Sequence, residues 1–171
     1  MLKEIAKLRE ENLKLTAKDL DTAFLWGFAV FMVILSIQIA IAMVLFILDV
    51  HIENPIAEEI AGTLSMTSMV FVSIVQSTSE EIFFRGFLLE KIGEYSGYGV
   101  AIGATAFLFG LAHMGYGQVY PILMPIVMGI LLGYVVVKTK NLFSSITAHV
   151  TFNLVTFVVY IISQSLQSST L

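Results

Sequence analysis

The sequence contains no cysteine among its 171 residues. This absence excludes disulfide bonds, a thiolate nucleophile and any zinc or iron–sulfur site with cysteine ligands. Charge is also scarce, because Asp, Glu, Lys and Arg make up only 13% of the chain, against roughly 25% in an ordinary soluble domain. Nine basic residues and a net charge of −4 leave no basic surface for a run of phosphates. We therefore expect no nucleic-acid partner.

Apolar residues make up 57% of the chain, and its mean hydropathy is +0.89. The length predicts one domain. A helix needs roughly 20 apolar residues to cross the hydrocarbon core of a bilayer. Five apolar segments are predicted to do so, at residues 23–48, about 60–89, 99–113, 119–137 and 142–162. We therefore predict an all-α fold, a polytopic membrane bundle of about five transmembrane helices over residues 23–162.

The two ends of the chain differ from this bundle. Residues 1–22 hold five of the nine basic residues and are predicted to form a short amphipathic cytoplasmic helix. A dimerising zipper is the alternative, because Ile5, Leu8, Asn12 and Leu15 fit two heptads. A homo-oligomer would then form through residues 1–22 or through the membrane helices. Residues 163–171 form a polar tail without charge.

The basic residues predict how the chain is oriented in the bilayer. They lie before the first span, between the second and third, where Arg85 and Lys91 occur, and between the fourth and fifth, where Lys138 and Lys140 occur. With five spans, all of these positions fall on one side, which the positive-inside rule assigns to the cytoplasm. We expect an integral protein of a prokaryotic plasma membrane, with its N-terminus in the cytoplasm and its C-terminus outside.

Glycines four residues apart allow helix backbones to approach closely in lipid. The sequence has three such pairs, Gly93 and Gly97, Gly99 and Gly103, and Gly129 and Gly133. They indicate a compact bundle and carry no chemistry of their own.

Several polar or ionisable groups interrupt the apolar segments. Such groups are costly in hydrocarbon and usually face the interior of a bundle. They are Glu80, Glu81, Arg85, His113, His149 and Asn153. Counting about 1.5 Å per residue from the predicted helix ends places Glu80, both histidines and Asn153 roughly 10 to 20 Å from the cytoplasmic face. They could therefore share one layer in the inner half of the membrane.

The spacing of the two glutamates predicts different roles for them. Glu81 and Arg85 stand four residues apart, so their side chains can form a supporting ion pair along one helix face. Glu80 is rotated by about 100° from Glu81 and has no such partner nearby. An unpaired carboxylate in a site of low dielectric constant suits a general base or acid.

The remaining polar groups favour hydrolysis of an amide, by either of two routes. His149 and Asn153 also stand four residues apart, and as hydrogen-bond donors they could hold an oxyanion while Glu80 and His113 activate water. Alternatively, Glu80, His113 and His149 could ligate zinc. An HExxH motif is absent, which excludes the familiar helical zinc-protease arrangement. We predict that no cofactor is required, because Asn153 beside His149 looks more like a donor pair than a ligand pair.

Three short motifs occur in order along the apolar segments. They are EEIFFRG at residues 80–86, FGLAH at 109–113 and HVTFN at 149–153. They resemble the EExxxR, FxxxH and HxxxN motifs of the CPBP family, also called the Abi family, which comprises type II CAAX prenyl proteases and bacteriocin-processing proteases. The resemblance spans about residues 65–160. It implies an intramembrane endopeptidase in which Glu80 and His113 activate water, His149 and Asn153 form the oxyanion site, and Glu81 and Arg85 support them.

The resemblance also limits what can be expected of the substrate. Larger CAAX proteases are similar to an eight-helix arrangement, whereas this chain has room for about five spans. The expected substrate is a membrane-embedded or prenylated peptide or protein, cleaved near the cytoplasmic face. The alternative is a non-catalytic membrane immunity or scaffold protein of the same family. A small transporter is a third possibility, but the segments show no inverted repeat.

Overall fold

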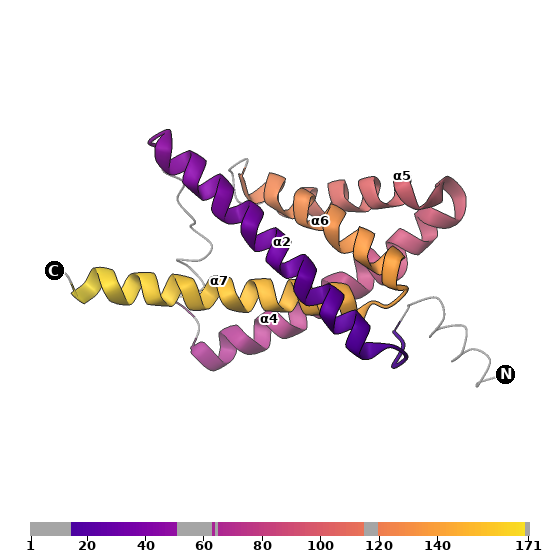
Figure 1. The fold of residues 1–171 in the computed structure, drawn as a ribbon, viewed down its shortest axis with the longest axis horizontal. Helices are drawn as coiled ribbons and strands as arrows, with labels where there is room; N and C mark the ends of the chain where they lie inside the picture. The colour runs from indigo at the N-terminus through magenta and orange to yellow at the C-terminus, as the bar shows by residue number, and fades with distance from the viewer. Residues whose placement is uncertain (1–14, 51–62, 64, 115–119, 170–171) are drawn as a thin grey trace.

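The computed structural model describes residues 15–50, 63, 65–114 and 120–169. Its helices are α2 (Leu20–Ile47), α4 (Met66–Glu81), the π-helix η1 (Ile82–Leu88), α5 (Leu89–Leu111), α6 (Tyr120–Thr139) and α7 (Phe143–Ser169). Every regular element in these ranges is helical, which confirms the predicted all-α class. Helices α2 and α7 cross each other, and α6 packs against both and against α5 (Figure 1).

Three helices are long and apolar enough to cross a membrane in the described part of the chain. They cover Leu20–Ile47, Ile122–Thr139 and Phe143–Ser163. The other two predicted spans are not confirmed. Helix α4 has only 16 residues and is rich in serine and threonine, and α5 is interrupted by a break. Two polar residues of α4, Ser77 and Glu81, form hydrogen bonds with α7.

The second and third predicted segments are joined by continuous helix and not by a loop. Helix α4 begins at Met66 and is capped by Ser65, whose Oγ accepts a hydrogen bond from the N–H of Ser68. It then runs without a break through η1 into α5. Gly97, with φ 78° and ψ 156°, interrupts α5 and turns the chain back on itself (Figure 1). Glycine tolerates this backbone conformation because it has no Cβ.

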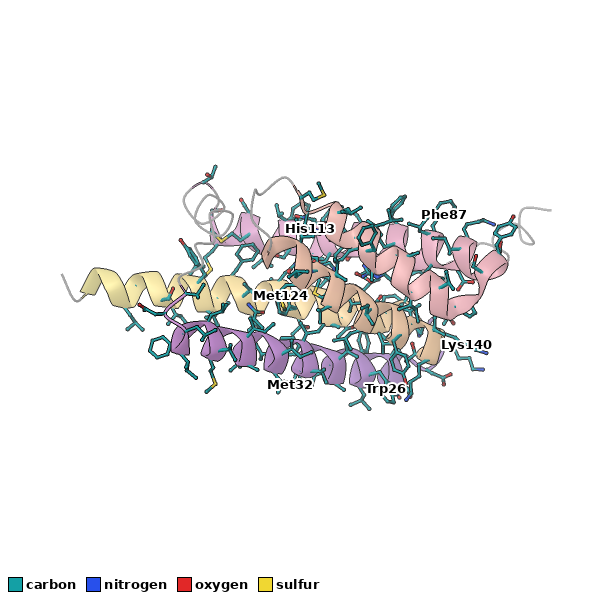
Figure 2. All side chains as sticks on the ribbon, turned by 90° about the horizontal axis from the view of Figure 1, so that it is seen from above. Trp26, Met32, Phe87, His113, Met124 and Lys140 are labelled. Carbon is teal, nitrogen blue, oxygen red and sulfur yellow. The ribbon has the colours of Figure 1, made fainter. Side chains whose placement is uncertain are left out.

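Most of the predicted N-terminal helix lies outside the described residues, which begin at position 15. Residues 15–19 form turn and irregular backbone, so a helix does not continue through them. The Nδ2 group of Asn141 donates to the carbonyls of Thr16 and Lys18. This contact ties the start of α2 to the loop between α6 and α7. Trp26 and Lys140 lie at that same end of the bundle (Figure 2).

Glycine allows the helices to approach closely at several crossings. A Cβ at Gly27 would lie 2.6 Å from the carbonyl oxygen of Ser144 on α7, and one at Gly129 would lie 2.9 Å from Cα of Ala106 on α5. By contrast, a Cβ at Gly99 or at Gly103 would meet nothing within 4 Å. Of the three predicted glycine pairs, Gly129 and Gly133 therefore lie in a helix–helix contact. The two pairs on α5 do not, since a Cβ at Gly93 would meet only Tyr98 of the same helix and one at Gly97 would meet nothing within 4 Å.

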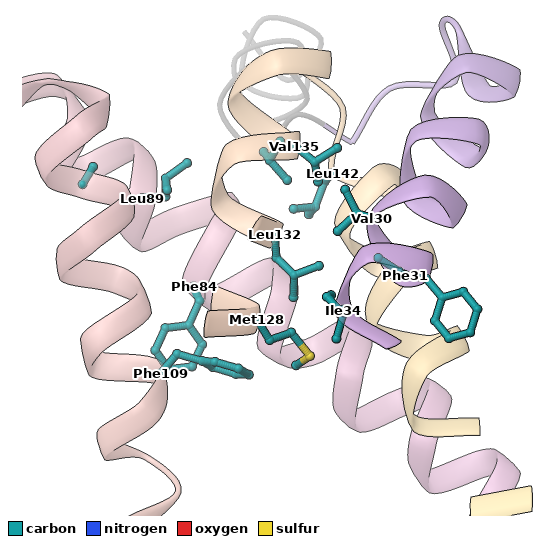
Figure 3. Packing of buried hydrophobic residues seen from close by; sticks show 13 residues of the cluster. Val30, Phe31, Ile34, Phe84, Leu89, Phe109, Met128, Leu132, Val135 and Leu142 are labelled. Carbon is teal, nitrogen blue, oxygen red and sulfur yellow. The ribbon is translucent and has the colours of Figure 1, made fainter. Parts of the chain in front are cut away.

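The apolar core joins all of these helices except α4. It is shown in Figure 3 and includes Val30, Phe31, Ile34, Phe84, Leu89, Phe109, Met128, Leu132, Val135 and Leu142. Phe84 and Phe109 lie at one edge of this cluster (Figure 3), next to the polar groups of the motifs.

Candidate active site

The packing of α4 against α7 brings two polar faces together. Each face repeats every four residues, as expected for one side of a helix. Ser77, Glu81 and Arg85 form the face on α4 and η1, and Ser145, His149 and Asn153 form the face on α7. Ser77, Glu81, Arg85 and Ser145 have no exposed surface, and His149 is 3% exposed.

Glu81 is the point at which the two faces connect. Its Oε1 accepts hydrogen bonds from Nη1 of Arg85 and from Nδ1 of His149, each at 2.9 Å. The bond to Arg85 follows the four-residue spacing, whereas the bond to His149 could not be read from the sequence. Because an ionised carboxylate only accepts, Nδ1 of His149 carries the hydrogen, and Nε2 faces the opposite direction.

Arg85 is buried between aromatic rings. The centre of its guanidinium lies 4.4 Å from the ring centroid of Phe109 and 5.7 Å from that of Phe84. Its Nε and Nη2 atoms have no hydrogen-bond partner among the described residues. A Cβ on Gly129 would lie 3.2 Å from Nη2. The charge pattern predicts that Arg85 lies at the cytoplasmic side between two spans, but its side chain lies in the bundle interior, where Glu81 neutralises it.

Glu80 lies at the edge of this cluster, with its side chain 22% exposed. Its Oε2 is 3.7 Å from Nε2 of His149, and its Oε1 accepts a hydrogen bond of 3.0 Å from Nε2 of Gln76. We expected Glu80 to lack a nearby positive charge. Arg85 interacts electrostatically with Glu80, and a protonated imidazole of His149 would give Glu80 a second cationic neighbour.

His113 lies at the end of α5, beside the ring of Phe109. Its Nδ1 is 2.7 Å from the carbonyl oxygen of Phe109, and the two rings meet edge to face with centroids 4.9 Å apart. A carbonyl only accepts, so Nδ1 carries the hydrogen and Nε2 of the neutral ring is free to accept a proton. The ring of Phe109 also contacts His149, at 5.8 Å. Within the described ranges, no hydrogen bond joins His113 to Glu80 or His149.

Asn153 is held by a residue that the sequence did not single out. Its Nδ2 donates to Oγ of Ser77, at 2.9 Å. The available signal was the position of Ser77, four residues before Glu81 and therefore on the same helix face. Serine is so common in this segment that the spacing alone would not have distinguished it.

A zinc site at this position would need Glu80, His113 and His149 to converge on one point. Nowhere in the described ranges do three His, Asp or Glu side chains converge as a metal site would require. Glu80, His113 and His149 therefore do not fit a three-ligand zinc site as they lie, and we derive no step through a metal.

Comparison with models of protein families identifies the family of this chain. A family model described as "Type II CAAX prenyl endopeptidase Rce1-like" matches residues 26–155. This range contains all the polar side chains described above. Searches with the chain give no significant match to a curated protein or to a solved structure.

Proposed function

The chain belongs to the Rce1-like family of type II CAAX prenyl endopeptidases, and on this premise we propose that it is an intramembrane endopeptidase. It hydrolyses a peptide bond of a membrane-associated or lipidated protein near the cytoplasmic face. The observation that carries the proposal is the placement of His149 between the carboxylates of Glu81 and Glu80. A buried ion pair alone would need only Glu81 and Arg85, whereas a partly exposed second carboxylate beside an imidazole suits catalysis.

Glu80 and His113 activate the attacking water. Glu80 is the most accessible carboxylate of the cluster, and Gln76 fixes one of its oxygens. His113 offers Nε2 as a proton acceptor, because its Nδ1 is bound to the carbonyl of Phe109. The water loses a proton to these groups as its oxygen bonds to the scissile carbonyl carbon. The proton then passes to the leaving nitrogen as the C–N bond breaks, which yields one carboxylate and one amine.

His149 and Asn153 stabilise the tetrahedral oxyanion that forms in between. Glu81 orients the imidazole through Nδ1, so Nε2 faces the side of Glu80. When the ring carries both protons, Nε2–H is a donor for the oxyanion. Asn153 lies one helical turn further along α7 and supplies an amide N–H on the same face. Two such donors in a site of low dielectric constant act on the charge that develops in the transition state.

The proposal is tested with the purified protein in lipid nanodiscs. The substrates are a farnesylated peptide and a peptide tethered by a transmembrane segment, and cleavage is followed by mass spectrometry. Glu80→Gln removes the proposed base at nearly constant volume and should reduce kcat by about 10² or more. Glu94→Gln is the matched control, because Glu94 is exposed and pairs only with Lys91 among the described contacts. Equal turnover of wild type and Glu80→Gln would contradict the assignment.

A further inference from the structure

We infer that Ser77 is a positioning residue, which holds the carboxamide of Asn153 so that its remaining N–H faces the oxyanion. The inference rests on the proposed function, since it assigns a task within the same site. It concerns a residue outside all three motifs, on the turn of α4 that precedes the glutamate pair.

The contact between Ser77 and Asn153 joins two helices in the buried part of the bundle. Ser77 has no exposed surface. Its Oγ accepts a hydrogen bond of 2.9 Å from Nδ2 of Asn153, which lies 76 residues later in the sequence. An amide nitrogen has two hydrogens. Because Ser77 takes one of them, the other is left for a ligand, and its direction is set by the plane of the amide.

Other serines on α4 use their hydroxyls differently. Oγ of Ser73 donates to the carbonyl of Met69, and Oγ of Ser79 donates to the carbonyl of Val75, each at 2.7 Å. Both bonds stay within α4, which is the usual behaviour of serine inside a helix. Ser77 instead contacts the neighbouring helix. Its hydroxyl therefore has a different kind of partner from that of Ser73, although both serines are buried on the same face of α4.

The physical reason for such a contact lies in the freedom of the asparagine side chain. The torsion that turns a carboxamide about its last bond has broad minima, so its oxygen and nitrogen can exchange places at little cost. With Oδ1 in place of Nδ2, the amide would present a lone pair to the oxyanion and repel it. In the structure, Ser77 holds the amide in the opposite orientation, because its Oγ accepts a hydrogen bond from Nδ2. Holding a donor in advance is what makes an oxyanion site effective.

The first experiment compares Ser77→Ala with Ser73→Ala in the nanodisc assay. We expect Ser77→Ala to lower kcat by about tenfold with little change in KM, because the lost interaction is made in the transition state. Ser73→Ala removes a hydroxyl from the same face, one turn away, and should keep wild-type kcat. Ser77→Thr restores the hydroxyl and should recover part of the loss. Equal kcat for the two alanine variants would overturn the inference.

The second experiment tests whether Ser77 acts through Asn153. In a double-mutant cycle, Ser77→Ala should have almost no effect on kcat when Asn153 is already alanine. The same cycle is measured on thermal unfolding, which needs no catalytic activity. There, the two single changes should be non-additive, and additivity would show that the side chains are not coupled.

These outcomes separate the inference from the function on which it rests. If wild type cleaves neither substrate, the proposed function is wrong, and if wild type and Glu80→Gln cleave equally fast, the role of Glu80 is wrong. If Glu80→Gln and Asn153→Ala lose activity while Ser77→Ala does not, the proposed function stands and the role of Ser77 is wrong. A loss in Ser77→Ala that persists unchanged in the Asn153→Ala background would also overturn the role.

Discussion

Nδ1 of His149 lies 2.9 Å from Oε1 of Glu81, although 68 residues separate them in the sequence. This bond connects α7 to the end of α4 and determines which imidazole nitrogen faces Glu80. It also places Glu81 between a cationic side chain and the proposed oxyanion donor. Glu81 is therefore both a structural partner of Arg85 and the residue that orients His149.

Because Glu81 bonds both Arg85 and His149, replacing it is predicted to lower the stability of the protein strongly. Glu81→Gln leaves the buried guanidinium of Arg85 without its paired charge, which should lower the free energy of unfolding by about 3 kcal/mol or more. Glu81→Gln combined with Arg85→Met should be less destabilised than Glu81→Gln alone, because no buried charge is then left unpaired. Thermal unfolding in detergent measures both, with Glu94→Gln as the exposed control. Similar midpoints for Glu81→Gln and Glu94→Gln would contradict the importance of the pair.

His113 provides a test that separates packing from proton transfer. His113→Phe keeps an aromatic ring against Phe109 but removes Nε2 as a proton acceptor. We expect kcat to fall by about 10², with a thermal midpoint close to that of wild type. The variant also loses the bond to the carbonyl of Phe109, so His113→Asn serves as a second variant that retains a polar group. Wild-type turnover in both variants would exclude His113 from water activation.

Gly129 is predicted to be intolerant of even one methyl group. A Cβ there would lie 2.9 Å from Cα of Ala106 and 3.2 Å from Nη2 of Arg85. We expect Gly129→Ala to separate α5 and α6 and to cost about 1–3 kcal/mol. Gly99→Ala is the matched control, because the same methyl group at Gly99 would meet nothing within 4 Å. If Gly129→Ala unfolds at the wild-type temperature, the close approach is not required.

We predict that peptide hydrolysis does not require a metal ion. In the proposed mechanism, Glu80 and His113 supply the base and His149 and Asn153 supply the oxyanion donors, so no metal-bound water is needed. Treatment with a chelator followed by gel filtration should leave kcat unchanged, and elemental analysis of the pure protein should find less than one metal per chain. Activity that is lost on chelation and restored by zinc would show that this prediction is wrong.

The fold class and the main spans could be predicted because they depend on local composition. Long uncharged runs such as residues 23–48 can satisfy their backbone groups in lipid only as helices. The pairing of Glu81 with Arg85 is local in the same way, because a separation of four residues places two side chains on one face. The π-helix at Ile82–Leu88 was not predicted, since the sequence pattern of a single π-helical segment resembles that of an α-helix.

The remaining contacts depend on how the helices are placed against each other. His149 contacts Glu81 because α7 packs along α4, and Ser77 contacts Asn153 for the same reason. Many serines and any of the three histidines could make such contacts, and their local spacing does not indicate which partner they contact. By itself, the sequence determined a helical membrane bundle and identified the polar groups that must be kept away from lipid. Only the tertiary structure decided which of these groups lie within hydrogen-bond distance, because helix packing, and not helix periodicity, sets distances between residues far apart in the chain.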